Sequence, residues 1–174
     1  MTAAQRRNRI LNELQRADAP ISAATLAHAL SVTRQVIVGD VALLRAQGHE
    51  IAATPRGYLI PDTAPTGLVR RMACFHSAED TRDELNIMVD CGCTVLDVIV
   101  EHPVYGQLTA PLQLASRYDV EQFMQRMHQS DAAPLSLLTE GIHLHTLSCP
   151  GEDVWQHLRN ILAERGFLLA EQDT

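Results

Sequence analysis

Several features are absent from this chain of 174 residues, and each absence narrows the class of protein. It has no stretch of eighteen apolar residues, so no membrane-spanning helix and no membrane partner are expected. Its first residues are polar and lack the apolar segment of a signal peptide, so we expect a cytoplasmic protein. Only four cysteines are present, too few for a small disulfide scaffold, and we expect them to be reduced. The CxC of Cys91 and Cys93 has no partner pair at zinc-site spacing, which disfavours a metal site there.

Lysine is also absent, and the fourteen arginines are distributed unevenly against the acidic residues. Residues 1–60 hold seven Arg and four acidic residues, a net charge of +3. Residues 61–174 hold seven Arg and seventeen acidic residues, a net charge of −10. A basic first third before an acidic remainder predicts a DNA-binding head joined to a body that could sense a ligand.

The first third has the pattern of a winged helix-turn-helix domain. Apolar residues at helical spacing predict three helices, over residues 2–17, 23–30 and 34–47. Ser22 and Thr33 are expected to cap the second and third helices. Two short strands are expected within residues 49–60, and we place the whole domain at residues 1–61.

The third helix is expected to read DNA. In a helix-turn-helix pair the second helix lies in the major groove, with its N-terminal residues against base edges. Here those residues are Thr33, Arg34 and Gln35. Arg pairs well with guanine and Gln with adenine, so these side chains suit direct readout. Arg56, in the turn between the two strands, is expected to contact phosphate or the minor groove. The alternative is a helical hairpin used only for protein contacts.

A first family resemblance rests on these residues. Residues 33–45, followed by Gly48, Ile51 and residues 57–59, resemble the winged helix of the biotin-repressor type. Gly39 departs from that pattern, which has a long polar residue at this position. A full biotin ligase is excluded, because the remaining residues are few and contain no glycine-rich nucleotide loop.

Residues 62–67 have the composition of a linker, and a second domain is expected over residues 68–174. Its predicted elements are strand, helix, strand, strand, helix, strand and helix, over residues 68–75, 78–89, 94–101, 107–114, 120–128, 142–148 and 152–165. Pro111 favours an edge position for its strand. The order βαββαβ predicts a ferredoxin-like domain with an added C-terminal helix, so the chain is of the α+β class. We expect its first and last strands to share one sheet without being direct neighbours.

Histidines in this second domain suggest a metal site. His143 and His145 are two residues apart in a predicted strand, so both imidazoles lie on one face. His76 ends the first strand, and Asp80 and Glu84 share a face of the helix that follows. Imidazoles with a carboxylate suit Zn, Ni, Fe or Co better than Ca or Mg. The residues alone do not decide whether Asp80 or Glu84 takes part. They also leave open the alternative that the histidines form a polar sheet face and bind no metal.

A second resemblance is more specific. His76 with residues 79–85, residues 102–106 and residues 134–146 resemble the 3H domain, which is named for its histidines. A biotin-repressor-type winged helix followed by a 3H domain is similar to the NiaR family of niacin-responsive transcriptional repressors. The resemblance implies control of genes of NAD synthesis and niacin uptake, with nicotinic acid as co-repressor. It also implies one divalent transition metal per chain, bound by His76, Glu84, His143 and His145.

Three further residues are candidates for contact with the effector. His102 matches the 3H pattern, and its place just before Pro103 and Tyr105 favours a role beside the ligand or behind a metal ligand. Tyr105 is expected to stack on the pyridine ring. Arg82 is a candidate for the carboxylate of nicotinate, and a solvent-exposed helix charge is its alternative role.

One winged domain buries too little surface for tight specific binding, so a homodimer on a two-fold-symmetric operator is expected. Because the basic heads would repel each other, the acidic body is the expected dimer contact. Two other functions remain open at this point. One is a metal-dependent hydrolase with a DNA-binding appendage. The other is a repressor that senses another small molecule, such as an amino acid.

Overall fold

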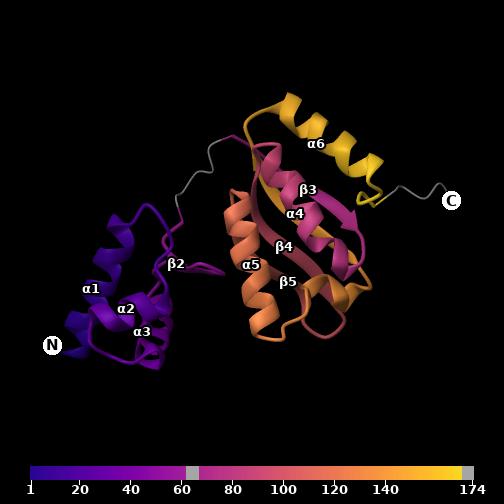
Figure 1. Cartoon of the computed structure of the whole chain (residues 1–174). Helices are drawn as coiled ribbons and strands as arrows, with labels where there is room; N and C mark the ends of the chain where they lie inside the picture. Colours follow the sequence, from indigo (N-terminus) through magenta and orange to yellow (C-terminus); the bar gives the residue numbers. More distant parts are fainter. Residues whose placement is uncertain (62–66, 170–174) are drawn as a thin grey trace. The chain divides into compact units, whose positions relative to one another are not determined.

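The computed structural model describes residues 1–61 and 67–169. It divides into two compact units, Met1–Thr63 and Ala64–Thr174, here called the N-terminal and C-terminal units (Figure 1). The predicted linker at 62–67 lies outside the described residues, except for Gly67. None of the described helices combines the length and the hydropathy that crossing a membrane requires.

The N-terminal unit has the three helices and the hairpin that the sequence predicts. Its elements are α1 (Ala3–Arg16), α2 (Ala23–Ala29), α3 (Arg34–Ala46), β1 (Ala52–Thr54) and β2 (Gly57–Leu59). The predicted caps are confirmed, since the Ser22 hydroxyl accepts the Thr25 N–H at 3.0 Å and the Thr33 hydroxyl accepts the Val36 N–H at 3.3 Å. These side chains satisfy N–H groups that have no partner inside the helix.

One apolar core holds the N-terminal unit together, and backbone hydrogen bonds join the hairpin to the chain before α2. The core residues come from all three helices, the C-cap of α2 and the loop before β1: Ile10, Leu14, Leu26, Ala27, Leu30, Ile37, Val41, Leu44 and Ile51. Ile21 and Tyr58 exchange two backbone hydrogen bonds of 2.8 Å, which join the chain before α2 to β2. Gly57, with φ +137°, lies against the Ile21 carbonyl, so a side chain at position 57 would collide with the backbone.

The C-terminal unit confirms the predicted order of elements. Its strands and helices are β3 (Leu68–Phe75), α4 (Thr81–Asp90), β4 (Thr94–His102), β5 (Gly106–Leu114), α5 (Arg117–Gln129), β6 (Ile142–Cys149) and α6 (Glu152–Glu164). Two short 3₁₀ helices are also present, η1 (Ala78–Asp80) and η2 (Leu135–Thr139). The sequence pattern did not predict η2, and α5 begins earlier than predicted because Ser116 caps it by accepting the Asp119 N–H at 3.2 Å.

The strand order corrects one expectation. The sheet runs β3-β6-β4-β5 with every neighbouring pair antiparallel, so β3 and β6, the first and last strands of this unit, are direct neighbours. Two helical crossovers build this sheet. In β3–α4–β4, strand β6 lies between the two strands that the helix joins, and in β5–α5–β6 strand β4 does. β5 is an edge strand, as Pro111 predicted.

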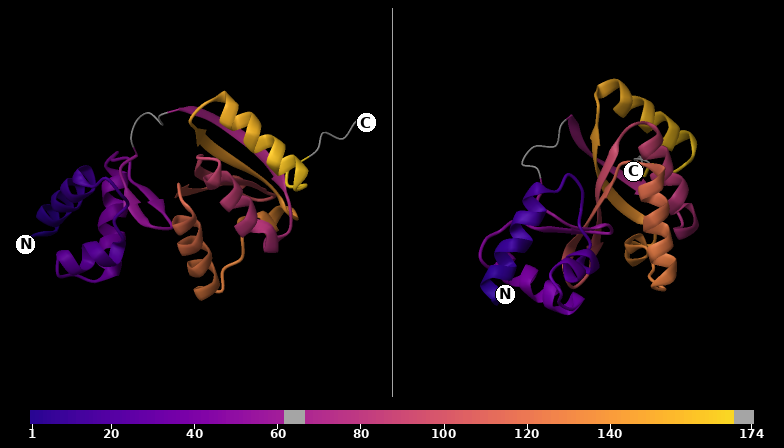
Figure 2. Two further views of the ribbon diagram at one scale, coloured as in Figure 1. Left: turned by 45° about the horizontal axis from the view of Figure 1, so that its top comes forward. Right: turned by 60° about the vertical axis from the view of Figure 1, so that its left-hand side comes forward.

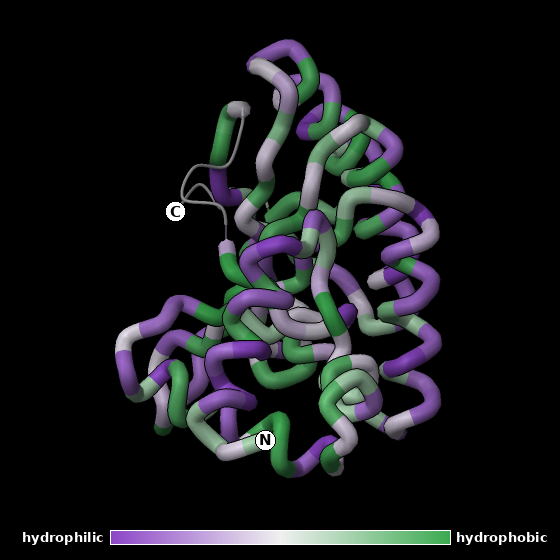
Figure 3. Tube along the Cα trace, turned by 90° about the vertical axis from the view of Figure 1, so that its left-hand side faces the viewer, coloured by the Kyte–Doolittle hydropathy of each residue, from purple (hydrophilic) through white to green (hydrophobic). Residues whose placement is uncertain are grey.

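The helices α4, α5 and α6 lie on one side of this sheet (Figure 2), and the core fills the space between. Leu85 and Met88 of α4, Val120 of α5 and Leu158 of α6 meet the inner side chains of all four strands. The helices alternate hydrophobic and hydrophilic residues along the tube of Figure 3, as expected where one side of each helix is buried. Groups that the central part of β3 and β6 carries on this face, such as Cys74, His143 and His145, are therefore removed from water.

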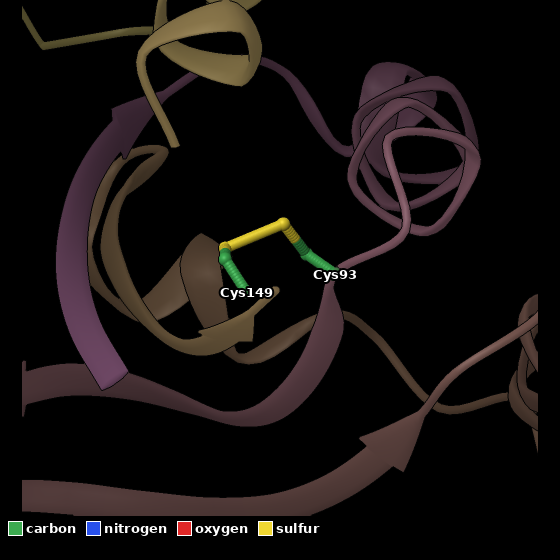
Figure 4. Close-up of a disulfide and its surroundings, with 2 residues drawn as sticks. All are labelled: Cys93 and Cys149. Atoms are coloured by element: carbon green, nitrogen blue, oxygen red, sulfur yellow. A yellow bond between two sulfur atoms is a disulfide. The ribbon is translucent and has the colours of Figure 1, made fainter. Parts of the chain in front are cut away.

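The cysteines differ from the expectation that all four are reduced. Cys93, just before β4, forms a disulfide with Cys149, at the end of β6, with a Cα–Cα distance of 4.4 Å (Figure 4). Cys91 and Cys93 therefore do not act together as metal ligands. Cys74 and Cys91 are free thiols. Local sequence patterns do not predict this pairing, because β4 and β6 become neighbours only through the sheet order.

The exposed side of α3 yields a prediction on stability. A Cβ at Gly39 would meet no atom within 4 Å, so Gly39→Ala is expected to raise the free energy of unfolding by about 0.5–1 kcal/mol through helix propensity. Denaturant unfolding of the N-terminal unit measures this change. Gly57→Ala is the matched control and should destabilise the unit. A Gly39→Ala variant no more stable than the parent would contradict the prediction.

Candidate functional site

The pairing of β3 with β6 brings four possible metal ligands onto one face of the sheet. The register places Cys74 opposite His143 and Met72 opposite His145. Residues two apart in a strand share a face, so Cys74 and His76 lie on the same side as the two histidines of β6. This is the side covered by helices. Glu84 extends from α4 into the same space and is fully buried.

Three imidazoles surround the Glu84 carboxylate. His76 Nε2 lies 2.7 Å from Glu84 Oε2, His143 Nε2 lies 3.1 Å from Oε1, and His145 Nε2 lies 3.3 Å from Oε2. All three histidines are buried. The structure thus brings together the four residues that the resemblance implied as metal ligands, and it selects Glu84 over Asp80.

The hydrogen bond that each imidazole makes through Nδ1 holds its Nε2 toward the Glu84 carboxylate. Each Nδ1 lies against a backbone carbonyl: His76 with Ser77 at 2.7 Å, His143 with Gly141 at 2.9 Å, and His145 with Asp97 at 2.7 Å. A carbonyl oxygen only accepts, so each Nδ1 carries a hydrogen and donates it. In the neutral imidazole the lone pair is then on Nε2, directed at Glu84. Histidines that bind metals are held in this way, with the other ring nitrogen bound to a backbone carbonyl or carboxylate.

His76 provides a test of whether a cation fits here. Its Nε2 lies 2.7 Å from Glu84 Oε2, yet it makes no hydrogen bond with that oxygen or any other described atom. A buried nitrogen without a hydrogen bond is costly, and a lone pair facing a carboxylate oxygen is repelled. A metal ion bound to both atoms would remove both penalties. The donors, imidazole nitrogen and carboxylate oxygen, suit a first-row transition ion.

Without a metal, the cluster shifts the titration of its own members. Burial alone would raise the pKa of Glu84, but His145, His143 and His76 outweigh it and hold that pKa well below its usual value. Burial likewise opposes protonation of His145 and His76, but the close negative charge of Glu84 raises the pKa of both. In the metal-free protein the site therefore favours an ionised carboxylate beside protonated imidazole.

Cys74 is the member of the cluster that the sequence reasoning missed. Its Sγ and the donor atoms of Glu84 and His143 all lie within 4.8 Å of one another. Burial and the neighbouring Glu84 raise the pKa of the Cys74 thiol. A signal existed in the sequence, because Cys74 and His76 are two residues apart in a strand, as His143 and His145 are.

The segment that follows α6 closes the site at the outer edge of β3. The Phe75 N–H donates to the Phe167 carbonyl at 2.8 Å, and the Leu169 N–H donates to the Ala73 carbonyl at 3.1 Å. The Phe167 ring packs on His76, with 5.2 Å between ring centroids. This segment therefore contributes to the burial of the histidine cluster.

The residues predicted to bind the effector are placed differently from one another. His102, at the end of β4, accepts the Val104 and Tyr105 N–H groups on Nδ1 at 3.1 and 3.2 Å. The register places His102 on the helix-covered face, at the same end of the sheet as His143. Tyr105 is largely exposed, and its ring lies 5.0 Å from that of His102.

Arg82 is not brought to the cluster. It forms an ion pair with Glu121 of α5, and both side chains are partly exposed. On a helix, two positions separate side chains by about 200°, so Arg82 and Glu84 face different sides of α4. The solvent-exposed charge that the sequence left as an alternative describes the observed position of Arg82.

The predicted DNA-binding residues lie at the start of α3 and in the hairpin. Arg34 and Gln35 are exposed in the first turn of α3, as base contact requires. The Thr33 hydroxyl oxygen accepts the Val36 N–H and so caps the helix. A contact of Thr33 with DNA would use the same hydroxyl group. Arg56 lies in the turn between β1 and β2 and is half-buried. Arg6 of α1 has a structural role, because its Nε lies 2.5 Å from Asp40, which is buried.

The cluster gives a prediction for the metal-free protein. A histidine with a raised pKa stabilises the fold below the ordinary value of 6.5, and this contribution is lost as pH rises through the raised pKa. In the presence of a chelator, the free energy of unfolding of the C-terminal unit is therefore expected to fall as pH rises above 6.5. Urea unfolding across pH measures this. Glu84→Gln should flatten the profile, and a parent profile already flat above pH 6.5 would contradict the prediction.

Comparison with known proteins agrees with this two-unit structure. Residues 6–59 match the HTH domain, and residues 69–171 match the 3H domain. The chain is 41% identical over 174 residues to the transcription repressor NadR of Bacillus subtilis, covering 98% of this chain and 97% of that protein. It is 40% identical over 167 residues to the probable transcription repressor NiaR of Thermotoga maritima, covering 96% of this chain and 95% of that protein.

Both relatives are named as repressors, and both are matched over nearly their whole length. The chain is accordingly a regulator with a DNA-binding helix-turn-helix domain, and the hydrolase that the sequence left open is set aside. It belongs to the NadR/NiaR family of transcription repressors.

Proposed function

We propose that this repressor controls genes of NAD synthesis and niacin uptake in the cytoplasm, with nicotinic acid as its co-repressor. In this proposal the N-terminal unit binds operator DNA, and the C-terminal unit holds one divalent transition metal that takes part in binding the effector. The relatives named NadR and NiaR support the regulatory role. The metal is inferred from the chemistry of the histidine cluster, and nicotinic acid as effector is what the resemblance to the NiaR family implies.

The observation that carries the metal proposal is the common orientation of three imidazoles. All three donate Nδ1–H to a backbone carbonyl and direct Nε2 at one buried carboxylate. Protonating all three would place three positive charges beside one negative charge in a site removed from water, which is costly. One divalent ion lets all three remain neutral. His76, Glu84, His143 and His145 would hold it, and the bound metal would supply a Lewis acid for a ligand nitrogen.

Nicotinate has the complementary chemistry. Its pyridine nitrogen is a ligand for a borderline metal, and its carboxylate accepts hydrogen bonds. We propose that His102 contacts the effector, since it lies on the cluster's face and at its end of the sheet. Its Nδ1 accepts two backbone N–H groups, so in the neutral ring Nε2–H is a donor. Tyr105 is retained as a candidate for stacking, and Arg82 is omitted because it pairs with Glu121.

For DNA we propose that a homodimer binds a two-fold operator, with the acidic C-terminal unit as the dimer contact. A single winged domain offers too little surface for tight specific binding, and helix-turn-helix dimers meet half-sites one or more helical turns apart. Effector binding then acts by favouring one of two arrangements of the dimer, which is differential binding to two states. Sedimentation of the repressor–operator complex should give two chains per operator.

The DNA-binding surface is tested by substitution at the start of α3. Arg34→Ala is expected to remove a bidentate base contact and so to weaken the free energy of operator binding by about 1–3 kcal/mol. Its binding to random DNA should weaken much less. Arg56→Ala is the comparison variant and should weaken binding to both DNAs alike, as loss of a phosphate contact does. Fluorescence anisotropy at fixed salt measures both. Equal losses on operator and random DNA for Arg34→Ala would refute the assignment.

The metal centre is tested by truncating the histidines of β6. His143→Ala and His145→Ala should each lose the metal and the response to nicotinate together, and keep non-specific DNA affinity, which depends on the basic first third. The C-terminal unit should also melt at a lower temperature, because a bound metal stabilises the folded state. Metal analysis, calorimetry with nicotinate and operator binding measure these effects.

His157→Ala is the matched control, since His157 is exposed on α6 and should retain all three properties. Full nicotinate affinity in both β6 variants after chelation would show that the effector binds elsewhere. The protein could instead bind metal and respond to an amino acid but not to nicotinate. That result would favour a repressor that senses another small molecule, the alternative that the sequence left open.

A further inference from the structure

Cys74 lies inside the histidine cluster, although the residues matched to the 3H pattern as ligands are histidines and a glutamate. Its side chain is fully buried, and the register places it directly opposite His143. Its Sγ and the donor atoms of Glu84 and His143 lie within 4.8 Å of one another. Among the described residues, no other sulfur lies in a possible metal-binding group.

These separations are close to those of ligands on one ion. Metal–sulfur bonds are about 2.3 Å and metal–nitrogen or metal–oxygen bonds about 2.0–2.2 Å, so two ligands on one ion are at most about 4.5 Å apart. Donors within 4.8 Å of each other reach that arrangement with shifts of a few tenths of an ångström. Cys74, Glu84 and His143 therefore need no change in strand register or helix position to share an ion, and His76 and His145 already contact the same carboxylate.

Charge balance provides an independent argument. A divalent ion with three neutral imidazoles and the Glu84 carboxylate leaves a net charge of +1 in a fully buried site. Buried charge is costly unless it is compensated. A thiolate at Cys74 brings the centre to zero. Asp97 also lies near His145, but its Oδ1 accepts the Thr146 N–H at 3.0 Å on the neighbouring strand.

We propose that Cys74 binds the metal through its sulfur, as a fifth protein ligand beside the three histidines and Glu84. This inference rests on the proposed metal centre. On binding, the Sγ–H bond is replaced by an Sγ–metal bond and the proton passes to solvent, with no electron transferred. Five protein ligands leave one position of an octahedral ion for a pyridine nitrogen. The thiolate also makes the site selective for thiophilic ions such as Zn, Co and Ni over Mn or Mg.

The competing role for Cys74 is that of a small apolar side chain in the core, which is common for a buried free cysteine. The two roles differ in a spectroscopic signature. A thiolate on Co²⁺ gives a charge-transfer absorption in the near ultraviolet, whereas nitrogen and oxygen ligands give only the weak visible bands of the metal. Substitution with cobalt therefore separates a sulfur ligand from a packing residue.

The experiment uses the full chain, freed of metal by chelation and titrated with Co²⁺ alone, without nicotinate or reductant. Omitting reductant keeps the Cys93–Cys149 disulfide closed. The parent is expected to bind one Co²⁺ and to show the near-ultraviolet band. Cys74→Ala and Cys74→Ser should lose the band and retain the visible bands. Cys91→Ser is the matched control, because it removes the other free thiol and should keep the band.

Affinity provides a second measure. Loss of a residue that only supports a ligand typically lowers metal affinity by about 10- to 100-fold, so Cys74→Ala should lower Zn²⁺ affinity by at least about tenfold. Its Mn²⁺ affinity should change much less. Competition with a chromophoric chelator measures both, and circular dichroism verifies that the variant is folded. X-ray absorption of the zinc-loaded parent needs no substitution and should show one sulfur at about 2.3 Å.

The outcomes separate this inference from the proposed function. A parent that binds one Co²⁺ without the band, or a Cys74→Ala variant that keeps the band, overturns the Cys74 ligand and leaves the histidine centre intact. A zinc spectrum with nitrogen and oxygen neighbours only has the same meaning. A parent that binds no Co²⁺ overturns the metal centre itself, and the Cys74 inference with it.

Discussion

The burial of one carboxylate, Glu84, is the constraint on which the C-terminal unit depends. An ionised carboxylate removed from water requires compensating interactions, and here the nitrogens of three imidazoles contact its two oxygens. Those imidazoles come from β3 and β6, which are adjacent only because of the sheet order. The strand order, the α4 crossover and the site therefore depend on one another. Removing the carboxylate charge while keeping the helix would leave three buried imidazoles without a counter-charge.

The backbone does much of the orienting in this site. Each histidine is held by a carbonyl on Nδ1: that of Ser77 after β3, of Gly141 before β6 and of Asp97 within β4. Gly141 has φ +100°, and a Cβ there would press on the His76 carbonyl, so a side chain at this position would displace the strand end. Preorganised ligands lose little freedom on binding, which favours a tight metal site.

Some of these features could be predicted from the sequence and others could not. Helix caps, the order of elements and the edge position of β5 follow from local patterns, and each was confirmed. The pairing of β3 with β6 and the Cys93–Cys149 disulfide depend on strand order, which local periodicity does not encode. The spacing of Cys74 and His76 predicts that both lie on one face, but their meeting with the histidines of β6 depends on that strand order as well. The expectation that Arg82 lies at the effector site differs from the structure for another reason. The proximity of Arg82 to Glu84 in sequence suggested a shared site, but helical geometry separates the two side chains.

The energetics of α4 show why Glu84 is held so firmly. The ion pairs that join α4 to α5, Arg82–Glu121 and Arg117–Asp90, are exposed to solvent, and such surface pairs contribute little to stability. Leu85 and Met88 are fully buried beside Glu84, and each such side chain contributes about 1.5–3 kcal/mol. Apolar packing therefore fixes α4 on the sheet. Because Glu84 lies on that same buried side, it cannot leave the histidines unless α4 separates from the core.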